Sequence, residues 1–412
     1  MEQSGVAEPS GVTERSGVAV VVSGGGARGA YEAGVLSVLL PALEEQGLRT
    51  RIFVGTSAGA INAVAFASLS HLCAADAADK ALQLWRDVRW SSVFRSPLVA
   101  LVLPARRGSG RRRARGLLDT TPLATTLGRV INWDKLHENI DQGLTSVGVV
   151  ATACSTRRST VFLEGVADEP ATDEHRSIDY VSTRLEVSHV VASTAIPVVF
   201  PAVEVSRCRS RDWYADGGVR LNTPLKPAVD LLAAALVVVA SDPAETATDQ
   251  TAPAEPPPPS AGGGVALLLY ALMTDRMVED LRTLARKNER ATVAAKKGHD
   301  PIPWVFAGPR PGSFGPLAHL AGQVLQGRAP GQRPRRAVVR LLRRSAGAWV
   351  ARDPGRLEVL THLYFDPEFI DAAIELGRSD ARRSLDGAGA PQWHLTPDVP
   401  VPPPGPFGAC LS

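Results

Sequence analysis

The chain has 412 residues, of which 44% are apolar and 21% are charged, and its formal net charge is +3 at pH 7. This composition excludes a chain that is disordered as a whole, and it supplies enough apolar residues for a sizeable core. The four cysteines lie far apart and form no CxxC pair, so we expect no metal site and no disulfide framework: Cys73, Cys154, Cys208 and Cys410.

The first residues, 1–16, are polar and include acidic side chains without an apolar core. They do not have the pattern of a signal peptide, and we expect them to be disordered. No stretch of the sequence approaches the roughly 20 apolar residues that span a bilayer. We therefore expect a cytoplasmic protein that reaches a membrane only as a peripheral protein.

Strands alternate with helices along residues 17–241. Runs of valine and other apolar residues predict strands at 18–22, 51–54, 144–155, 159–165 and 235–241. Helical periodicity predicts helices at 30–45, 55–69 and 183–195, with a kink or break of the first helix at Pro41. This alternation predicts an α/β fold of three layers, α/β/α, around a central, mostly parallel sheet.

Beyond residue 241 the composition changes. Residues 242–264 are rich in proline and glycine and read as a linker. Residues 265–390 predict a mostly helical, mixed C-terminal extension that packs on the core, and residues 391–412 predict a proline-rich tail. An arginine-rich insertion, 104–116, interrupts the α/β domain.

A glycine-rich loop follows the first predicted strand. Gly24, Gly26 and Gly29 satisfy G-x-G-x-x-G between a strand and a helix, which is the fingerprint of a dinucleotide site. That fingerprint also requires an acidic residue at the end of the second strand, where this chain has Gly55. A nucleotide-binding oxidoreductase remains an alternative, although the chain lacks the acidic residue that would hydrogen-bond to the ribose of the dinucleotide.

The second strand leads into the sequence GTSAG. Gly55, Thr56, Ser57, Ala58 and Gly59 fit the nucleophile elbow, a sharp strand-to-helix turn that presents a serine hydroxyl at the edge of a sheet. The pattern is also common by chance, and the other interpretation is a turn of small residues that packs a helix on the sheet. Its position between a strand and a helix favours the elbow.

A candidate base for this serine is Asp216, which precedes Gly217 and Gly218 in a predicted loop. Aspartate before glycine is most often only a turn former. Histidine is the competing base, as in a catalytic triad. None of the eight histidines stands in a glycine-flanked loop after a strand, and four have the late position of a triad base: His299, His319, His362 and His394.

With GGGARG, GTSAG and DGG in this order, the chain resembles the patatin-like phospholipase family over about residues 18–230. The segments ASTAIPVVFPAVEV and RLNTPL around the aspartate are also typical of that family. The resemblance implies that 17–241 is a catalytic domain in which Ser57 is the nucleophile and Asp216 the base, without histidine. It also implies an oxyanion hole made by the backbone of one loop: Gly24, Gly25, Gly26, Ala27, Arg28 and Gly29.

The resemblance predicts a lipid acyl hydrolase that acts on lipids or phospholipids without a cofactor. Arg28 either holds the loop in shape or attracts an anionic head group. The arginine clusters at 104–116 and 333–345 are either solvated loops or a peripheral contact with anionic membrane. We expect no nucleic acid as a partner. A catalytically silent, membrane-binding scaffold protein is the further alternative.

Overall fold

The computed structural model describes residues 16–95, 118–207, 210–243, 264, 275–293, 301–310, 315–326 and 354–395. The predictions for the N-terminus, the arginine-rich segments 104–116 and 333–345, most of the linker and most of the tail lie outside these residues. Within the described part of the chain, no helix is both long and apolar enough to cross a membrane.

The centre of the fold is one mixed sheet. Its main path runs β5-β4-β3-β2-β1-β8-β9, and five of the eight strand pairings are parallel. The strands of this path are β1 (Ser16–Val22), β2 (Thr50–Thr56), β3 (Ser146–Ala153), β4 (Ser159–Glu164), β5 (Ile178–Ser182), β8 (Ala233–Val239) and β9 (Trp304–Ala307). The expected mostly parallel α/β sheet is confirmed.

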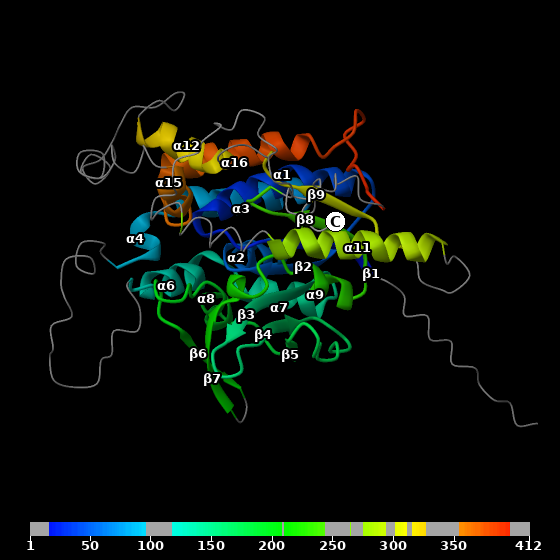
Figure 1. The fold of residues 1–412 in the computed structure, drawn as a ribbon, viewed down its shortest axis with the longest axis horizontal. Helices are drawn as coiled ribbons and strands as arrows, with labels where there is room; N and C mark the ends of the chain where they lie inside the picture. Colours follow the sequence, from blue (N-terminus) through cyan, green and yellow to red (C-terminus); the bar gives the residue numbers. More distant parts are fainter. Residues whose placement is uncertain are drawn as a thin grey trace, which may run out of the picture.

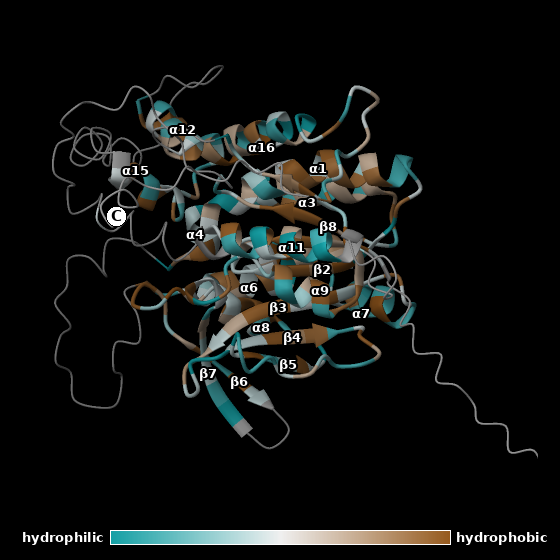
Figure 2. Cartoon of the chain, turned by 45° about the vertical axis from the view of Figure 1, so that its right-hand side comes forward, coloured by the Kyte–Doolittle hydropathy of each residue, from teal (hydrophilic) through white to brown (hydrophobic). Residues whose placement is uncertain are grey.

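A hairpin branches from the path. It consists of β6 (Val203–Arg207) and β7 (Ser210–Asp216), and β7 pairs antiparallel with β3. Figures 1 and 2 show this hairpin extending beyond the rest of the fold.

Helices cover both faces of the sheet because each central strand is apolar on both sides. In β1, Val18, Val20 and Val22 belong to one core cluster, and Ala19 and Val21 belong to the other. The first face carries α1 (Gly29–Glu45), α2 (Ala58–Ser68), α3 (Ala74–Asp87), α4 (Trp90–Val93), α6 (Thr121–Val130), α7 (Trp133–Asp141) and α8 (Val187–Ser193). The second face carries α9 (Leu225–Asp230) and α11 (Asp275–Val293). In Figure 2, β2 and β8 have the colour of apolar residues, whereas α11 carries hydrophilic residues on its visible side.

The described residues after the linker contribute to the same core. Strand β9 extends the sheet beside β8, and α11 packs on the second face. Three further helices, α12 (Pro316–Leu325), α15 (Pro354–Thr361) and α16 (Pro367–Arg382), lie beside the first layer (Figure 1), where α16 packs along α1. The Tyr31 hydroxyl of α1 donates a hydrogen bond of 2.8 Å to Asp380 of α16.

Two local predictions differ from the structure. Helix α1 continues through Pro41, so the expected break is wrong; the proline lies inside the helix, between buried Leu40 and Ala42. Asp216 is not in a loop but is the last residue of β7, which pairs with the buried strand β3. The sequence of this strand, SRDWYAD, neither alternates nor forms an apolar run, so it carried no strand pattern.

Candidate active site

The strand-to-helix turn at GTSAG is a sharp elbow. Ser57 stands between β2 and α2 with φ 53° and ψ −121°, a strained conformation for a residue with a side chain. A Cβ at Gly55 would lie 2.1 Å from the carbonyl oxygen of Gly59, and a Cβ at Gly59 would lie 2.3 Å from that of Ser23. The strand and the helix approach so closely that only glycine fits at both positions.

Two neighbours hold this elbow in place. The Ser57 backbone N–H donates to the Ser193 hydroxyl over 2.8 Å, and that hydroxyl donates to the Val150 carbonyl over 2.6 Å. The Thr56 hydroxyl donates to the Leu221 carbonyl over 2.8 Å. These bonds tie the strained turn to α8, β3 and the segment after Asp216.

Ser57 and Asp216 are brought together although 159 residues separate them. The Ser57 hydroxyl donates a hydrogen bond of 2.6 Å to Oδ2 of Asp216. The other carboxylate oxygen, Oδ1, accepts a bond of 2.7 Å from the Gly218 N–H, in the short 3-10 turn Gly217–Val219. The Asp216 backbone N–H donates to the Ala195 carbonyl. The carboxylate is therefore held from both sides.

The environment of Asp216 raises the pKa of its carboxyl group from the ordinary 3.8 to about 6. Burial is the main cause, and the hydrogen bonds from Ser57 and Gly218 oppose it in part. At pH 7 the group is mostly a carboxylate, yet it is a stronger base than an exposed aspartate. In the described part of the chain, no histidine hydrogen-bonds to the Ser57 hydroxyl.

The glycine-rich loop lies directly beside Ser57. A Cβ at Gly24 would lie 3.1 Å from the Ser57 Cβ. Four N–H groups of the loop already have acceptors: that of Gly24 donates to Asn222, that of Ala27 to His362, and those of Arg28 and Gly29 to carbonyls inside the loop. Among the described residues, the N–H groups of Gly25 and Gly26 have no acceptor. These two are the free donors of the predicted loop.

Arg28 is buried and fully engaged inside the protein. Its guanidinium forms ion pairs with Asp242 after β8, at 2.9 Å, and with Glu358 of α15, at 2.5 Å. It also donates to the Thr361 hydroxyl over 2.7 Å. Of the two roles considered for Arg28, these contacts favour the structural one, because they join the glycine-rich loop to a segment more than 300 residues away.

A second buried network lies behind the loop. Oε1 of Glu32 accepts a bond of 2.8 Å from the Ser23 hydroxyl, and Oε2 accepts one of 3.2 Å from the Asn62 amide. Asn62 in turn accepts a bond of 2.7 Å from the Trp85 indole. Burial raises the pKa of Glu32 well above its usual range. The network connects the start of the loop with α1, α2 and α3.

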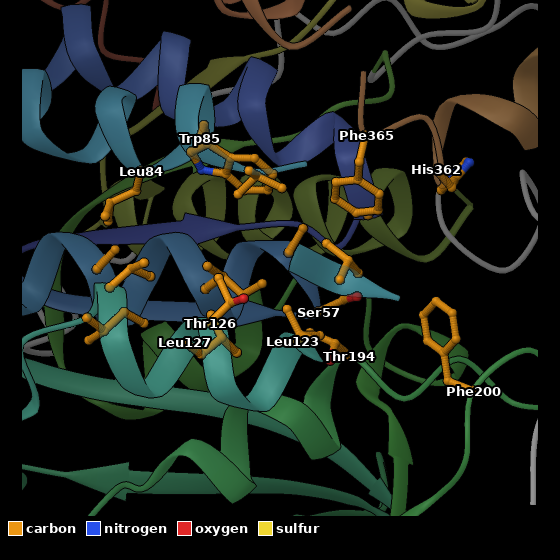
Figure 3. Close-up of a pocket in the computed structure, with 18 of the residues that line it drawn as sticks. Ser57, Leu84, Trp85, Leu123, Thr126, Leu127, Thr194, Phe200, His362 and Phe365 are labelled. Carbon is orange, nitrogen blue, oxygen red and sulfur yellow. The ribbon is translucent and has the colours of Figure 1, made fainter. Parts of the chain in front are cut away.

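An apolar pocket opens beside Ser57. It encloses about 790 Å³ of empty space, a figure that includes space open to solvent. Figure 3 shows Ser57 near Phe200, Phe365 and His362 at one end, and Leu84 at the other. Most side chains of its wall are apolar: Ala58, Ile61, Ala65, Leu84, Trp85, Val88, Val93, Leu123, Leu127, Val130, Ile131, Ile196, Phe200 and Phe365.

Several residues of the site were not named as site residues from the sequence, although Ser193 and Asn222 lie within the family-typical segments ASTAIPVVFPAVEV and RLNTPL. Ser193 and Asn222 hold the elbow and the loop through side-chain bonds, and Glu358 comes from the segment after the linker. His362 lines the pocket, and burial lowers the pKa of its imidazole well below the ordinary value. Across the described residues, no group of three or more His, Cys, Asp or Glu side chains could hold a metal ion.

Comparisons with known proteins agree with the motifs. A family model described as "Patatin-like phospholipase" matches residues 20–229, half of the chain. A solved structure, the crystal structure of VipD from Legionella pneumophila, matches with 13% identity and a TM-score of 0.29, covering 89% of this chain and 67% of that one. No curated protein matches the chain.

Proposed function

Because the chain belongs to the patatin-like phospholipase family, we propose that it cleaves acyl esters of lipids with Ser57 as nucleophile and Asp216 as base. The observation that carries this proposal is the 2.6 Å bond from the Ser57 hydroxyl to a buried carboxylate, on a strained elbow that opens into an apolar pocket. An activated serine needs this pairing of nucleophile and base within hydrogen-bond reach.

In the first half of the reaction, Ser57 Oγ attacks the ester carbonyl carbon while its proton passes to Oδ2 of Asp216. The carbonyl oxygen becomes an oxyanion, and the free N–H groups of Gly25 and Gly26 donate to it. When the carbon–oxygen ester bond breaks, the leaving alcohol takes the proton from Asp216, and the acyl group stays on Ser57. The raised pKa of Asp216, about 6, suits both the uptake and the return of this proton.

In the second half, water attacks the acyl-serine. Asp216 takes a proton from the water, the same N–H groups receive the second oxyanion, and the proton returns to Ser57 Oγ as the fatty acid leaves. Backbone donors of this kind act where charge develops, and the loss of one typically slows turnover on the order of 10²–10³-fold.

The pocket suits the acyl chain. Its wall consists mostly of aliphatic and aromatic side chains, so a hydrocarbon chain is favoured over a polar group by the area that it removes from water. The ester carbonyl then lies at the Ser57 end, and the alcohol part of the lipid lies outside the pocket. This arrangement favours lipid esters over short, polar esters.

A fluorophosphonate probe tests the nucleophile. The wild-type protein should be labelled at Ser57, and both Ser57→Ala and Asp216→Asn should abolish labelling and ester hydrolysis. The exposed Ser155 provides a control, because Ser155→Ala should keep both. Labelling that persists in Ser57→Ala would contradict the proposal, and a rise in melting temperature with NAD or NADP would favour the nucleotide-binding alternative.

We further propose that the arginine clusters at 104–116 and 333–345, which lie outside the described residues, attract anionic membrane. Each basic residue near such a surface adds about 1 kcal/mol at low salt. Replacement of Arg340, Arg343 and Arg344 by glutamine should weaken hydrolysis in anionic vesicles and spare soluble esters. Equal binding to neutral and anionic vesicles at every salt concentration would remove this proposal.

A further inference from the structure

Val198 is an exposed and strained apolar residue. Its side chain is 77% exposed, which is more than for any other large apolar residue in the described part of the chain. Its backbone has φ 71°, in the left-handed region that glycine favours and that a β-branched residue rarely adopts. Among the described residues, no neighbour buries the Val198 side chain, so burial does not offset the strain of its backbone. Such strain motivates the search for a function outside the fold, and the position of Val198 relative to the pocket carries the argument.

The position of Val198 connects it with the active site. It lies between Ile196 and Phe200, and both of these line the pocket beside Ser57. The segment is fixed on both sides, since Ala195 accepts a bond from the Asp216 N–H and Val199 accepts one of 2.8 Å from the Leu118 N–H. The valine is thus presented to solvent by the same loop that contributes Ile196 and Phe200 to the wall of the pocket.

We propose that Val198 inserts into the surface of a lipid bilayer and places the pocket entrance against it. This inference rests on the proposed function, because it supposes that the substrate comes from a lipid layer. An acyl chain that leaves the bilayer beside Val198 passes directly to Ile196 and Phe200, and so it moves from one apolar medium to another.

The chemistry near the loop favours a membrane over a protein partner. A protein partner would need a broad apolar patch, whereas Val198 is a single projecting side chain. A second exposed valine, Val219, lies in the short turn that follows β7. Asp216, the last residue of β7, donates its backbone N–H to the Ala195 carbonyl. The sequence between Arg95 and Leu118 contains six arginines and no acidic residue, and the Leu118 N–H at its end donates to the Val199 carbonyl beside Val198. A small apolar tip joined in sequence to a basic segment is suited to an anionic lipid surface.

The test replaces Val198 with residues that accept its backbone conformation. Glycine and asparagine both tolerate a positive φ, so Val198→Gly and Val198→Asn should fold with a melting temperature equal to or above that of the wild type. Both remove the apolar tip. In the inactive Ser57→Ala background, each should weaken binding to sedimented phosphatidylcholine–phosphatidylglycerol vesicles about tenfold, the expected effect of losing one inserted valine.

Leu232 provides a matched control. It is also exposed, at 41%, and also has a positive φ, 59°. Leu232 precedes β8, whose first residue pairs with the first residue of β1. It therefore lies at the amino-terminal ends of the parallel strands, whereas Ser57 follows the carboxyl-terminal end of β2. Leu232→Gly should therefore relieve similar strain and leave vesicle binding unchanged.

The activity assays separate this inference from the proposed function. With active protein, Val198→Gly should slow hydrolysis of vesicle lipids about tenfold and keep kcat/KM for a soluble short-chain ester. If both substrates are hydrolysed as by the wild type and vesicle binding is unchanged, the role of Val198 is refuted while the function stands. If the wild type hydrolyses neither substrate, the proposed function fails first, and the binding assay in the Ser57→Ala background still decides the role of Val198.

Discussion

Ionisation of Asp216 should make the native protein less stable at neutral pH than at acid pH, and replacement of Asp216 by asparagine should remove this contribution. The carboxyl group is buried, and its pKa in the folded protein is about 6 against an ordinary value of 3.8. Folding therefore favours the protonated form. The stability that protonation provides is complete below pH 3.8 and is lost as the pH rises through 6.

The magnitude follows from these two pKa values. One pH unit of difference corresponds to about 1.4 kcal/mol, so the ionised Asp216 lowers the free energy of unfolding at pH 8 by about 3 kcal/mol relative to strongly acid conditions. Asparagine has the same shape and no charge. Its carbonyl can accept the bond from Gly218, and its amide can donate to the Ser57 hydroxyl. Asp216→Asn should therefore be inactive and more stable.

Chemical denaturation of the wild type and of Asp216→Asn at several pH values between 4 and 8 measures the effect. The stability of the variant relative to the wild type should grow by roughly 2–3 kcal/mol across this range. Asp79→Asn is the control, because Asp79 is exposed on α3 and its replacement should give no such trend. A difference between variant and wild type that is the same at pH 4 and pH 8 would refute the raised pKa.

In the proposed mechanism the same ionisation controls catalysis. Because the base must be unprotonated, kcat/KM for a soluble ester should fall tenfold per pH unit below about 6 and be constant above 7. The profile of kcat/KM reports the free enzyme, so it should give the same pKa as the stability difference. An inflection near 3.8 in the rate profile would contradict both results.

Three further changes test other parts of the site. Gly26→Ala would place a Cβ 2.1 Å from the His362 carbonyl oxygen, so it should lower kcat about 10²-fold or more, whereas Gly47→Ala, with a similar positive φ and open space around it, should not. Glu358→Gln removes one of the two ion pairs of Arg28, and urea unfolding should show that the free energy of unfolding falls by roughly 1–3 kcal/mol. In this variant kcat should be reduced by a larger factor than KM is raised, and Glu358→Asp should restore part of both losses. Leu84→Trp narrows the far end of the pocket and should lower kcat/KM for long-chain esters about tenfold more than for short-chain esters; an equal loss for both would place the acyl chain elsewhere.

The sequence predicted the central sheet well because its strands are apolar on both faces. Val18 to Val22 and Ala233 to Val239 are almost uninterrupted runs of small and β-branched residues, and such runs are distinctive. The elbow was predictable for a related reason. A turn that brings Gly55 and Gly59 into contact with backbone atoms permits few other residues at these positions, so the turn can be recognised from the sequence alone.

The remaining parts of the site depend on contacts between distant segments. Strand β7 is half exposed and polar, so its pattern did not predict that it places Asp216 at the edge of β3. Ser193 and Asn222 lie in segments that the family resemblance marked, but only the folded structure shows that they bond to Ser57 and Gly24. The partners of Arg28, Asp242 and Glu358, are 214 and 330 residues away from it, and no local pattern encodes such a distance.

The attachment of Arg28 to Glu358 and of Ala27 to His362 has a consequence for how the chain can be divided. The loop and the nucleophile come before the linker, whereas two of the contacts that fix the loop come after it. Two polypeptides separated within residues 244–263 would therefore each hold an incomplete site. Their hydrolytic activity, when mixed, would report the reassembly of the two halves, and the enzyme could serve as a split reporter whose signal appears only when the halves meet.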